Sequence, residues 1–533
     1  MKLKTRKISV AVILSLFILI VLLAAYLRLA SLNLGEFKSD EAGTSFVLKA
    51  LVQHGMVPLL GPPLSTAGNA GPFYYYILAI PFLISTNPLV SMIFVALVNV
   101  LGVIFIFKFA REFFNERIAL IASALEAVSP FAVLFSRKIW NPDLIFPFTV
   151  LLFYCVYSFV IKKKPKYLVP IFVLYAIILQ IHPITFFLAP VILLFIWQSR
   201  SQIQARYVLI GVAFGLVLFS PFIYGQVTTG FRETGFFAST LKNFAANVNP
   251  TVIQHISSNT SGSGFDYILG ADAPTFYSSI FNLNNYFVVE NICLYLGFAL
   301  IVIRAARTRK PFSGENLKYS ILLSWIAVPT VILIFFNSTA GLWTHHVVMF
   351  FPANFIVVAI LFDSAIGRKD SRSTEMTTAT NTAAEGAAAT APSSKLLPKL
   401  RFGKNAIVVL ILLSILLVQT VFDLSFLNFI NTQGGTSGDY GVALEYKADV
   451  AKYIAQNSNG TSFTISNNLT PGAIGLEYYY LLSLYGKAPS TFGSINYVVI
   501  NNVLGEGVDP LLLQQVSKDP KVSFGPLTVY TVR

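Results

Sequence analysis

Charged residues are scarce in this chain of 533 residues. They make up 12% of the sequence, about half of the fraction usual in a soluble domain, while hydrophobic residues reach 55%. So little charge cannot cover the surface of a soluble globular protein of this length. The composition therefore excludes that class and indicates a polytopic α-helical membrane protein.

Cysteine and nucleotide-binding motifs are also scarce or absent. The two cysteines, Cys155 and Cys293, lie inside apolar runs, so neither a disulfide framework nor a cysteine metal site is indicated. The sequence contains no phosphate-binding Gly-Lys-Ser/Thr loop, no dinucleotide-binding Gly-x-Gly-x-x-Gly after a strand and no nucleophile elbow. We therefore do not expect a cytosolic nucleotide as energy source or donor.

Apolar runs of near membrane-spanning length predict about eleven transmembrane helices. A shorter apolar run at 73–85 is interpreted as a helix at the outer interface, because a span there would invert the side of every later basic loop. The predicted spans are 8–27, 89–109, 118–136, 144–161, 167–182, 183–198, 207–224, 286–303, 319–336, 345–362 and 405–422.

Basic residues are distributed unevenly between the loops. Of the 38 Lys and Arg residues, 25 lie in the N-terminal flank and the even-numbered loops, which predicts that these segments face the cytoplasm. The N-terminus is then cytoplasmic in a plasma-membrane protein, and residues 28–88 and 225–285 form long outer loops. Topology, rather than nucleic-acid binding, accounts for the net charge of +14.

The chain after residue 368 differs in composition from the predicted catalytic module over 1–368. Residues 369–404 are rich in Thr, Ala and Ser and predict a disordered cytoplasmic linker before the last span at 405–422. Residues 423–533 regain a soluble composition and predict a small extracytoplasmic α/β domain. Its expected helices are 446–456 and 475–485, and its expected strands are 462–466, 497–501 and 527–532.

Asp40 and Glu41 are the centre of a short acidic segment that follows the first predicted span. Carboxylates just outside the membrane are readily solvated and can act as bases toward a lipid-borne substrate, so both residues are catalytic candidates. The alternative is that they cap the helix suggested by residues 42–54, since acidic side chains favour a helix start. The dipeptide alone leaves both interpretations open.

Arg137, Lys138, Trp140 and Asp143 follow the third predicted span, on the same side as Asp40. Outer basic residues oppose the positive-inside trend, and Arg and Lys can hold a lipid phosphate. The alternative is that these cations anchor lipid headgroups at a helix end. Asp143 is a third candidate acid, although its place after Asn-Pro also suits a helix N-cap.

Other polar residues at predicted outer span ends are candidate substrate contacts. A His-His pair without a regularly spaced third ligand is weak evidence for metal, so no metal site is indicated, a divalent metal stays an open alternative, and no other cofactor is expected. Interfacial structural histidines and an aromatic belt are the alternatives. These candidates are Tyr74, Tyr75, Trp140, His182, His345 and His346.

Glu126 lies inside the third predicted span, where a carboxylate is costly unless it is neutral or partnered. We interpret it as a protonated or hydrogen-bonded contact between helices, with Gln180 as the polar residue noted at similar depth. Glu126 is also compatible with a transporter or flippase of lipid-linked sugars, which is the alternative function. That class concentrates polar groups at mid-membrane, whereas most of the candidates here lie at the outer face.

The order of these features resembles the GT-C membrane glycosyltransferases. It is most similar to the branch that holds the protein O-mannosyltransferases of glycosyltransferase family 39 and the lipid A aminoarabinose transferases. The matching features are the acidic pair after the first span, the aromatic stretch at 72–76, and Ser136-Arg137 followed by Asp143. Together they extend over about residues 1–362.

This resemblance implies an inverting glycosyltransferase that moves a hexose or pentose from a polyprenyl-phosphate donor to a protein, lipid or glycan at the outer membrane face. It implies Asp40 as the base, Asp143 as a second acid and Arg137 or Lys138 as the donor-phosphate contact. One departure leaves the branch and the acceptor open. Residues 69–76 read Asn-Ala-Gly-Pro-Phe-Tyr-Tyr-Tyr where the family has His-Pro-Pro-Leu-Tyr-Tyr.

The predicted topology can be tested by cysteine labelling. Single cysteines introduced at Ser39 and Ser437 should react with a membrane-impermeant thiol reagent added from outside, whereas one at Ser371 should not, because the basic loops place it in the cytoplasm. Labelling of intact cells, compared with permeabilised cells, measures this. Reaction of all three positions from the same side would refute the topology.

Overall fold

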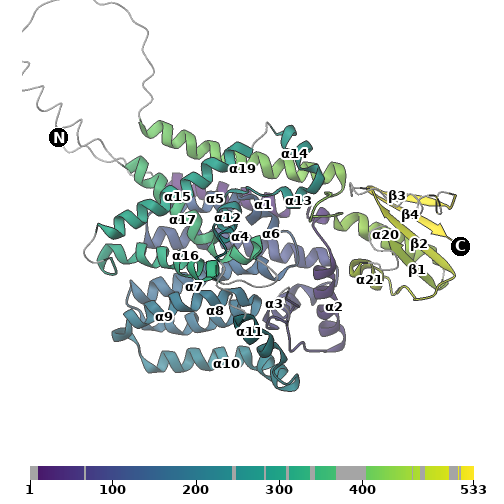
Figure 1. Cartoon of the computed structure of the whole chain (residues 1–533), viewed down its shortest axis with the longest axis horizontal. Helices are drawn as coiled ribbons and strands as arrows, with labels where there is room; N and C mark the ends of the chain where they lie inside the picture. The colour runs from purple at the N-terminus through teal and green to yellow at the C-terminus, as the bar shows by residue number, and fades with distance from the viewer. Residues whose placement is uncertain are drawn as a thin grey trace, which may run out of the picture.

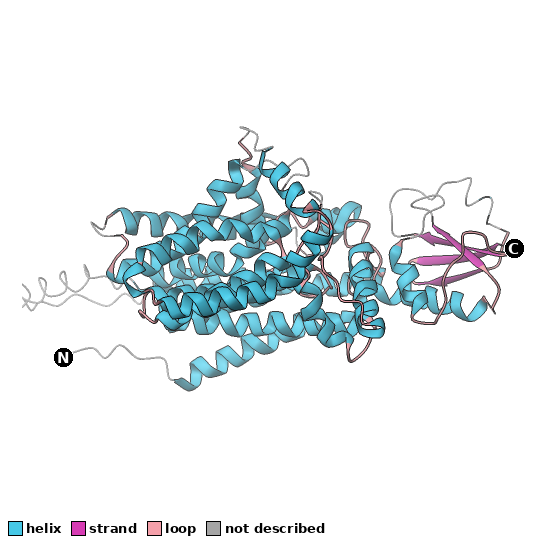
Figure 2. Cartoon of the chain, turned by 90° about the horizontal axis from the view of Figure 1, so that it is seen from below, coloured by secondary structure: helices cyan, strands magenta, loops and turns pink. Residues whose placement is uncertain are grey.

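The computed structural model describes residues 10–64, 68–242, 248–280, 284–307, 311–335, 342–367, 404–458, 460–467, 475–502, 514, 516 and 518–532. Within these residues, long α-helices form a bundle, and a small sheet domain projects from one end of it (Figure 1, Figure 2). This arrangement confirms the predicted fold class, a polytopic helical membrane protein with a small C-terminal α/β domain. The predicted linker at 369–404 lies almost entirely outside the described residues.

Eight of the described helices are long and apolar enough to cross a membrane, and each coincides with one of the predicted runs. Of the three shorter apolar helices, two coincide with the predicted spans 167–182 and 183–198 and one with the predicted interfacial helix at 73–85, so the total of about eleven spans stays a prediction. The eight are α1 (Val10–Leu29), α4 (Pro88–Phe113), α7 (Ile145–Val160), α10 (Ala205–Thr228), α15 (Asn284–Ala306), α16 (Leu317–Phe335), α17 (Phe351–Gly367) and α19 (Lys404–Gln433); the shorter ones are α3 (Phe73–Phe82), α8 (Leu168–Ile181) and α9 (Ala189–Gln198).

The third predicted span, 118–136, is divided in the structure into two helices, α5 (Glu116–Val128) and α6 (Pro130–Phe135). Pro130 explains the break, because proline lacks the backbone N–H and disfavours a helical conformation in the residue before it. Ser129 is accordingly extended, with ψ of 124°. The apolar periodicity of the sequence did not reveal this break, so the prediction of one continuous helix over 118–136 was wrong.

Short helices fill the connections between the long ones. Helix α2 (Ser39–His54) follows the first span, and four more helices lie between α10 and α15: α11 (Arg232–Lys242), α12 (Thr251–Ser261), α13 (Asp266–Leu269) and α14 (Ala273–Ser279). The 3-10 turns are η1 (Leu32–Leu34), η2 (Asn141–Leu144), η3 (Pro165–Tyr167), η4 (Pro183–Leu188), η5 (Arg200–Gln202), η6 (Gly270–Asp272), η7 (Gly314–Asn316) and η8 (Thr344–Phe350).

Helix α17 lies in the core of the bundle. Every residue from Phe351 to Ile360 is buried, as expected for a helix that is apolar on all sides and surrounded by other helices. It packs against α5 and α15. In the neighbouring α16, the Trp325 ring stacks on Phe153 of α7 with 3.6 Å between ring centroids. The core therefore consists of large apolar side chains from helices that are distant in sequence.

Two buried arginines tie helix ends together. Arg28, at the end of α1, donates to the carbonyls of Glu126 and Ala127 in the last turn of α5 and forms an ion pair with the Glu126 carboxylate at 2.9 Å. Arg137, after α6, donates to the carbonyls of Leu27, Ala30 and Ser31 at the end of α1. The last carbonyls of a helix lack partners within it, and a guanidinium satisfies several at once. Glu126 thus makes the expected interhelical contact, and its partner is Arg28.

The C-terminal domain contains a four-stranded sheet in the order β1-β2-β4-β3. Strand β1 (Phe463–Asn467) is parallel to β2 (Ile495–Asn501), with Ile465 opposite Tyr497. The other pairs are antiparallel, β2 with β4 (Leu527–Val532) and β4 with β3 (Lys521–Phe524). Helices α20 (Leu444–Asn457) and α21 (Leu476–Ser483) pack together. The sequence predicted these helices and three of the strands, and it missed β3, which is short and mostly exposed.

The C-terminal domain and the segment that leads into it donate hydrogen bonds to the loop between α1 and α2. Leu444 N–H donates to the Gly35 carbonyl at 3.0 Å, Lys447 Nζ donates to the Phe37 carbonyl at 2.7 Å, and the Tyr440 hydroxyl donates to the Leu34 carbonyl at 2.5 Å. Helix α21 packs on α2, and Figure 1 shows both at the same end of the bundle. This loop carries the acidic segment, so the domain fixes its backbone.

Removing a single oxygen atom tests this contact. Tyr440→Phe should lower the free energy of unfolding by about 1–3 kcal/mol, because it leaves the buried Leu34 carbonyl without its donor. Thermal unfolding of the purified protein in detergent measures the loss. Tyr485→Phe, at an exposed position in the same domain, is the matched control and should leave the unfolding temperature unchanged. Equal effects of the two changes would show that the contact does not stabilise the protein.

Candidate active site

A buried ion pair joins the acidic segment to the turn after α6. Lys138 Nζ lies 3.1 Å from Glu36 Oε2, and the other Glu36 oxygen lies 2.6 Å from Lys38 Nζ. Burial by itself would lower the pKa of the Lys138 ammonium, but attraction to Glu36, Glu41 and Asp143 outweighs it and raises the pKa. Lys138 is therefore permanently charged and is surrounded by three carboxyl groups.

Asp40 and Glu41 are adjacent in the first turn of α2 but lie in different environments. Glu41 is buried, and its Oε2 accepts the Lys38 backbone N–H at 2.9 Å, which caps the helix. Asp40 is exposed, and within the part of the chain that the structure describes its carboxylate has no hydrogen bond or ion pair. The capping role considered for the pair thus belongs to Glu41, and Asp40 keeps its oxygens available for a proton.

The environment of Glu41 changes its acidity. Burial, reinforced by repulsion from Glu36, raises the pKa of the Glu41 carboxyl from 4.5 to about 7, against the attraction of Lys138 and Lys38. Near neutral pH this carboxyl is therefore protonated in a large fraction of molecules. Glu41 is therefore not permanently ionised, and its predicted catalytic role stays a prediction.

Tyr74 and Tyr75 belong to α3, which packs against α2. Both rings are buried, with 5.7 Å between their centroids, and Tyr75 is within electrostatic reach of Asp40. The predicted aromatic stretch therefore lies beside the predicted base. Because both rings are covered by protein, their predicted contact with the substrate stays a prediction.

Asp143 is buried beneath Lys138. Its Oδ2 accepts the Trp140 backbone N–H at 3.1 Å, so Asp143 closes η2 from the third position of the turn, whereas the N-cap residue is Trp140 and not Asp143 as the Asn-Pro context suggested. Its other oxygen, Oδ1, has no hydrogen-bond partner within the described residues. Of the predicted cations, Arg137 donates its hydrogen bonds to backbone carbonyls and Lys138 is paired with Glu36, so the predicted phosphate contacts of both residues stay predictions.

The three predicted histidines come together at this end of the bundle. His182 ends α8, while His345 and His346 lie in η8, and one ring nitrogen from each lies within 4.8 Å of the others. The Trp140 ring connects them to the acidic segment: its centroid is 4.5 Å from that of His345 and 4.2 Å from Lys138 Nζ. All predicted contact residues except Arg137 thus belong to one continuous neighbourhood.

Sequence reasoning missed several members of this neighbourhood. Glu36 and Lys38 were part of the acidic segment but were assigned no role, although an acid and a base two residues apart beside a predicted membrane face suggest an ion-pair network. Tyr267, whose hydroxyl meets Thr344 Oγ1 at 2.9 Å, adds a polar side chain near Lys138. Nothing in the sequence around Tyr267 marked it, because its role depends on how α13 packs.

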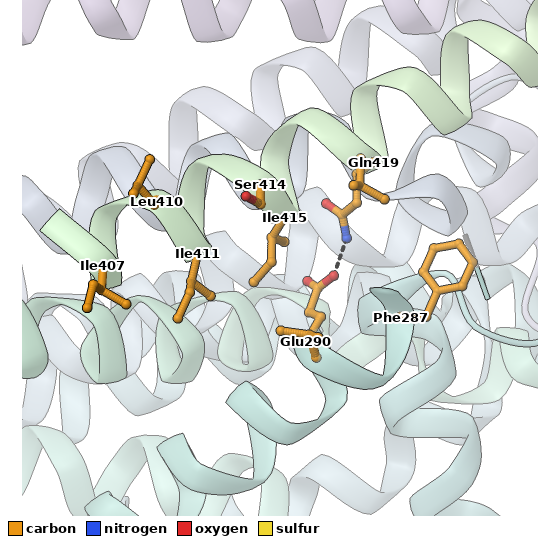
Figure 3. A pocket seen from close by; sticks show the side chains of 10 residues that line it. Phe287, Glu290, Ile407, Leu410, Ile411, Ser414, Ile415 and Gln419 are labelled. Carbon is orange, nitrogen blue, oxygen red and sulfur yellow. Dashed lines mark hydrogen bonds between the residues drawn. The ribbon is translucent and has the colours of Figure 1, made fainter. Parts of the chain in front are cut away.

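A second polar feature lies apart from this neighbourhood, between α15 and α19 (Figure 3). It is a cavity of about 280 Å³ with mostly apolar walls, in which the buried Glu290 carboxylate accepts a hydrogen bond from the Gln419 amide. No sequence pattern singled out either residue. Their pairing explains how a carboxylate is accommodated within a membrane-spanning helix, since each satisfies part of the other's hydrogen-bonding capacity.

Comparison with solved structures finds the same fold in two membrane proteins. The chain superposes on ArnT from Cupriavidus metallidurans bound to undecaprenyl phosphate with a TM-score of 0.53 and 14% sequence identity, over 98% of each chain. It also matches the oligosaccharyltransferase AglB from Archaeoglobus fulgidus in complex with an inhibitory peptide and a dolichol-phosphate. That TM-score is 0.50, with 12% identity, over 98% of this chain and 74% of that one.

Sequence comparison points to the same class. Residues 69–224 match the family model described as dolichyl-phosphate-mannose-protein mannosyltransferase, a segment that runs from just before α3 into α10. No curated protein sequence matches the chain. Together with the shared fold, this match confirms the resemblance to GT-C transferases that the order of sequence features indicated.

The raised pKa of the Glu41 carboxyl predicts a pH effect on stability. A buried carboxyl that holds its proton up to about pH 7 loses it on unfolding, since an exposed Glu titrates near 4.5; stability should therefore fall as pH rises from about 4.5 to about 7. Thermal unfolding across this range measures the decline. In Glu41→Gln, which stays neutral, the decline should be smaller, and a decline of the same size would assign it to other groups.

Proposed function

We propose that the protein is a glycosyltransferase that moves a sugar from a polyprenyl-phosphate donor to an acceptor at the outer face of the membrane. The observation that carries this proposal is Asp40: an exposed carboxylate at the start of α2, free of partners in the described chain and within electrostatic reach of Tyr75. The family match over 69–224 supports the reaction class. The solved complexes of ArnT and AglB, whose descriptions name undecaprenyl phosphate and a dolichol-phosphate, support the lipid-linked donor.

The proposed chemistry requires little from the protein beyond a base and an oriented site. Asp40 takes the proton from an acceptor hydroxyl or amine, and the acceptor attacks the anomeric carbon from the face opposite the phosphate. The bond between that carbon and the phosphate oxygen breaks, the lipid phosphate leaves with the electron pair, and the sugar inverts its configuration. Nearby cations stabilise the charge that develops on the leaving phosphate.

The surroundings of Asp40 suit this role. Lys138 is paired with Glu36 and attracted by Glu41, so this buried cation is neutralised by carboxyl groups other than Asp40. A direct ion pair would lower the basicity of Asp40 and occupy its oxygens. The buried carboxyls thus hold the cation, and the exposed carboxylate remains free to act on the acceptor.

Replacing the base tests the proposal. Asp40→Asn should reduce transfer from a polyprenyl-phosphate sugar by about 10²- to 10⁴-fold, because the amide keeps the size of the side chain but cannot accept the proton. Transfer is measured with purified protein and labelled donors, while thermal unfolding and donor binding should stay near those of the unchanged protein. Asp449→Asn, which changes an exposed acid on α20, is the control and should retain activity. Near-normal turnover of Asp40→Asn would refute this role for Asp40.

A further inference from the structure

Four of the five histidines of the chain gather at one end of the bundle. The centroids of the His345 and His346 rings are 4.2 Å apart, and the His182 ring lies 5.5 Å from His346 and 5.9 Å from His345. His255 in α12 is within electrostatic reach of the pair. These residues come from three separate segments of the chain, so their meeting is a product of the fold and not of sequence proximity.

Three clustered imidazoles suggest a metal site, but their hydrogen bonds argue against one. His182 Nδ1 accepts the Ile184 backbone N–H at 3.3 Å, and His346 Nδ1 accepts the Trp343 backbone N–H at 3.0 Å. A neutral imidazole that accepts on Nδ1 carries its hydrogen on Nε2. In these two rings, one nitrogen is thus occupied by a backbone donor and the other bears a proton, so neither offers a free lone pair to a cation.

The local fold fixes this arrangement of the protons. His182 precedes Pro183 and is the N-cap of η4, where its ring closes the first turn. His346 is the third residue of η8, and its ring reaches back to the N-cap residue Trp343. Both hydrogen bonds satisfy N–H groups that a helix start leaves without partners. A metal ion would have to break both caps in order to bind.

The charge next to His345 also disfavours a metal cation. The Lys138 ammonium lies over the Trp140 ring, which in turn packs against His345, and Lys138 repels positive charge on that imidazole. A divalent cation at the histidines would face the same repulsion. Two Nε2–H donors beside a permanent ammonium instead provide several hydrogen-bond donors for a group with several anionic oxygens.

We propose that His182, His345 and His346, together with Lys138, bind the phosphate group of the lipid-linked donor through N–H donors, and that this cluster is not a metal site. The inference rests on the proposed function and specifies where its leaving group is held. Lys138 touches both the acidic segment and the histidine side of the neighbourhood. An inverting displacement requires the phosphate on the face of the anomeric carbon opposite the acceptor, and the histidine cluster would hold it there.

Substitution of histidine by asparagine distinguishes the roles of the two ring nitrogens. In His182→Asn and His346→Asn, the amide oxygen can replace Nδ1 as acceptor and preserve the cap, while the Nε2–H donor is lost. Each should weaken binding of undecaprenyl phosphate, used without a sugar, by about tenfold, the usual effect of losing one charge-assisted hydrogen bond. His54→Asn, which changes the remaining, exposed histidine at the end of α2, should bind as the unchanged protein does.

Binding is measured in phosphatidylcholine nanodiscs by titration with undecaprenyl phosphate, and thermal unfolding verifies that each variant is folded. Inorganic phosphate in a second titration distinguishes recognition of the phosphate from recognition of the lipid. If the site recognises the phosphate group, inorganic phosphate should compete with undecaprenyl phosphate for binding. This competition should be weaker in the Asn variants. An unchanged affinity for undecaprenyl phosphate in a folded double variant, His182→Asn with His346→Asn, would overturn the proposal.

Two further outcomes bear on the inference. Retention of about one Zn²⁺ per chain after a chelator wash, lost in either Asn variant, would identify a metal site and overturn it. Histidine-dependent binding of undecaprenyl phosphate without any sugar transfer would support the phosphate site while refuting the proposed enzymatic function. If the protein transfers sugar but the histidine variants bind the donor as tightly as the unchanged protein, the enzymatic function is supported and the phosphate site is refuted. The two proposals can therefore fail separately.

Discussion

The buried ion pair between Glu36 and Lys138 is the interaction on which the organisation of the site depends. A buried charge without a partner is very costly, and removing one member of such a pair typically destabilises a protein by about 3–5 kcal/mol. The pair joins the loop before α2 to the turn after α6, two segments about a hundred residues apart. Near this pair, the buried Glu41 carboxyl caps α2 and has a raised pKa, whereas Asp40, one residue earlier, is exposed.

The same physical problem, unsatisfied groups at helix ends, explains much of the surrounding architecture. Arg28 and Arg137 cap carbonyls at the ends of neighbouring helices, and residues of the C-terminal segment satisfy the carbonyls of the loop that follows α1. His182 and His346 cap helix starts in turn. Structural hydrogen bonds therefore fix the orientation and tautomer of side chains that face the site, which preorganises them without a separate cost at the moment of binding.

Adjacent residues show where sequence reasoning reaches its limit. The pattern Asp40-Glu41 after an apolar run indicated both a base and a helix cap, and the structure assigns the cap to Glu41. Successive helical side chains point about 100° apart, so packing decides which one is buried. Likewise Arg137 and Lys138 looked equivalent as phosphate contacts, but one is directed to the backbone of α1 and the other to Glu36 and Trp140.

The sequence by itself determined the membrane class, the positions of the long helices and most of the C-terminal domain, because a helix satisfies its backbone locally and a membrane span needs only sustained apolarity. It also identified nearly all polar candidates at one face. Only the tertiary structure decided their partners: Arg28 for Glu126, Glu36 for Lys138, and the meeting of His182 with His345 and His346. These contacts join residues about a hundred or more positions apart, and their geometry follows from helix packing, which no local pattern records.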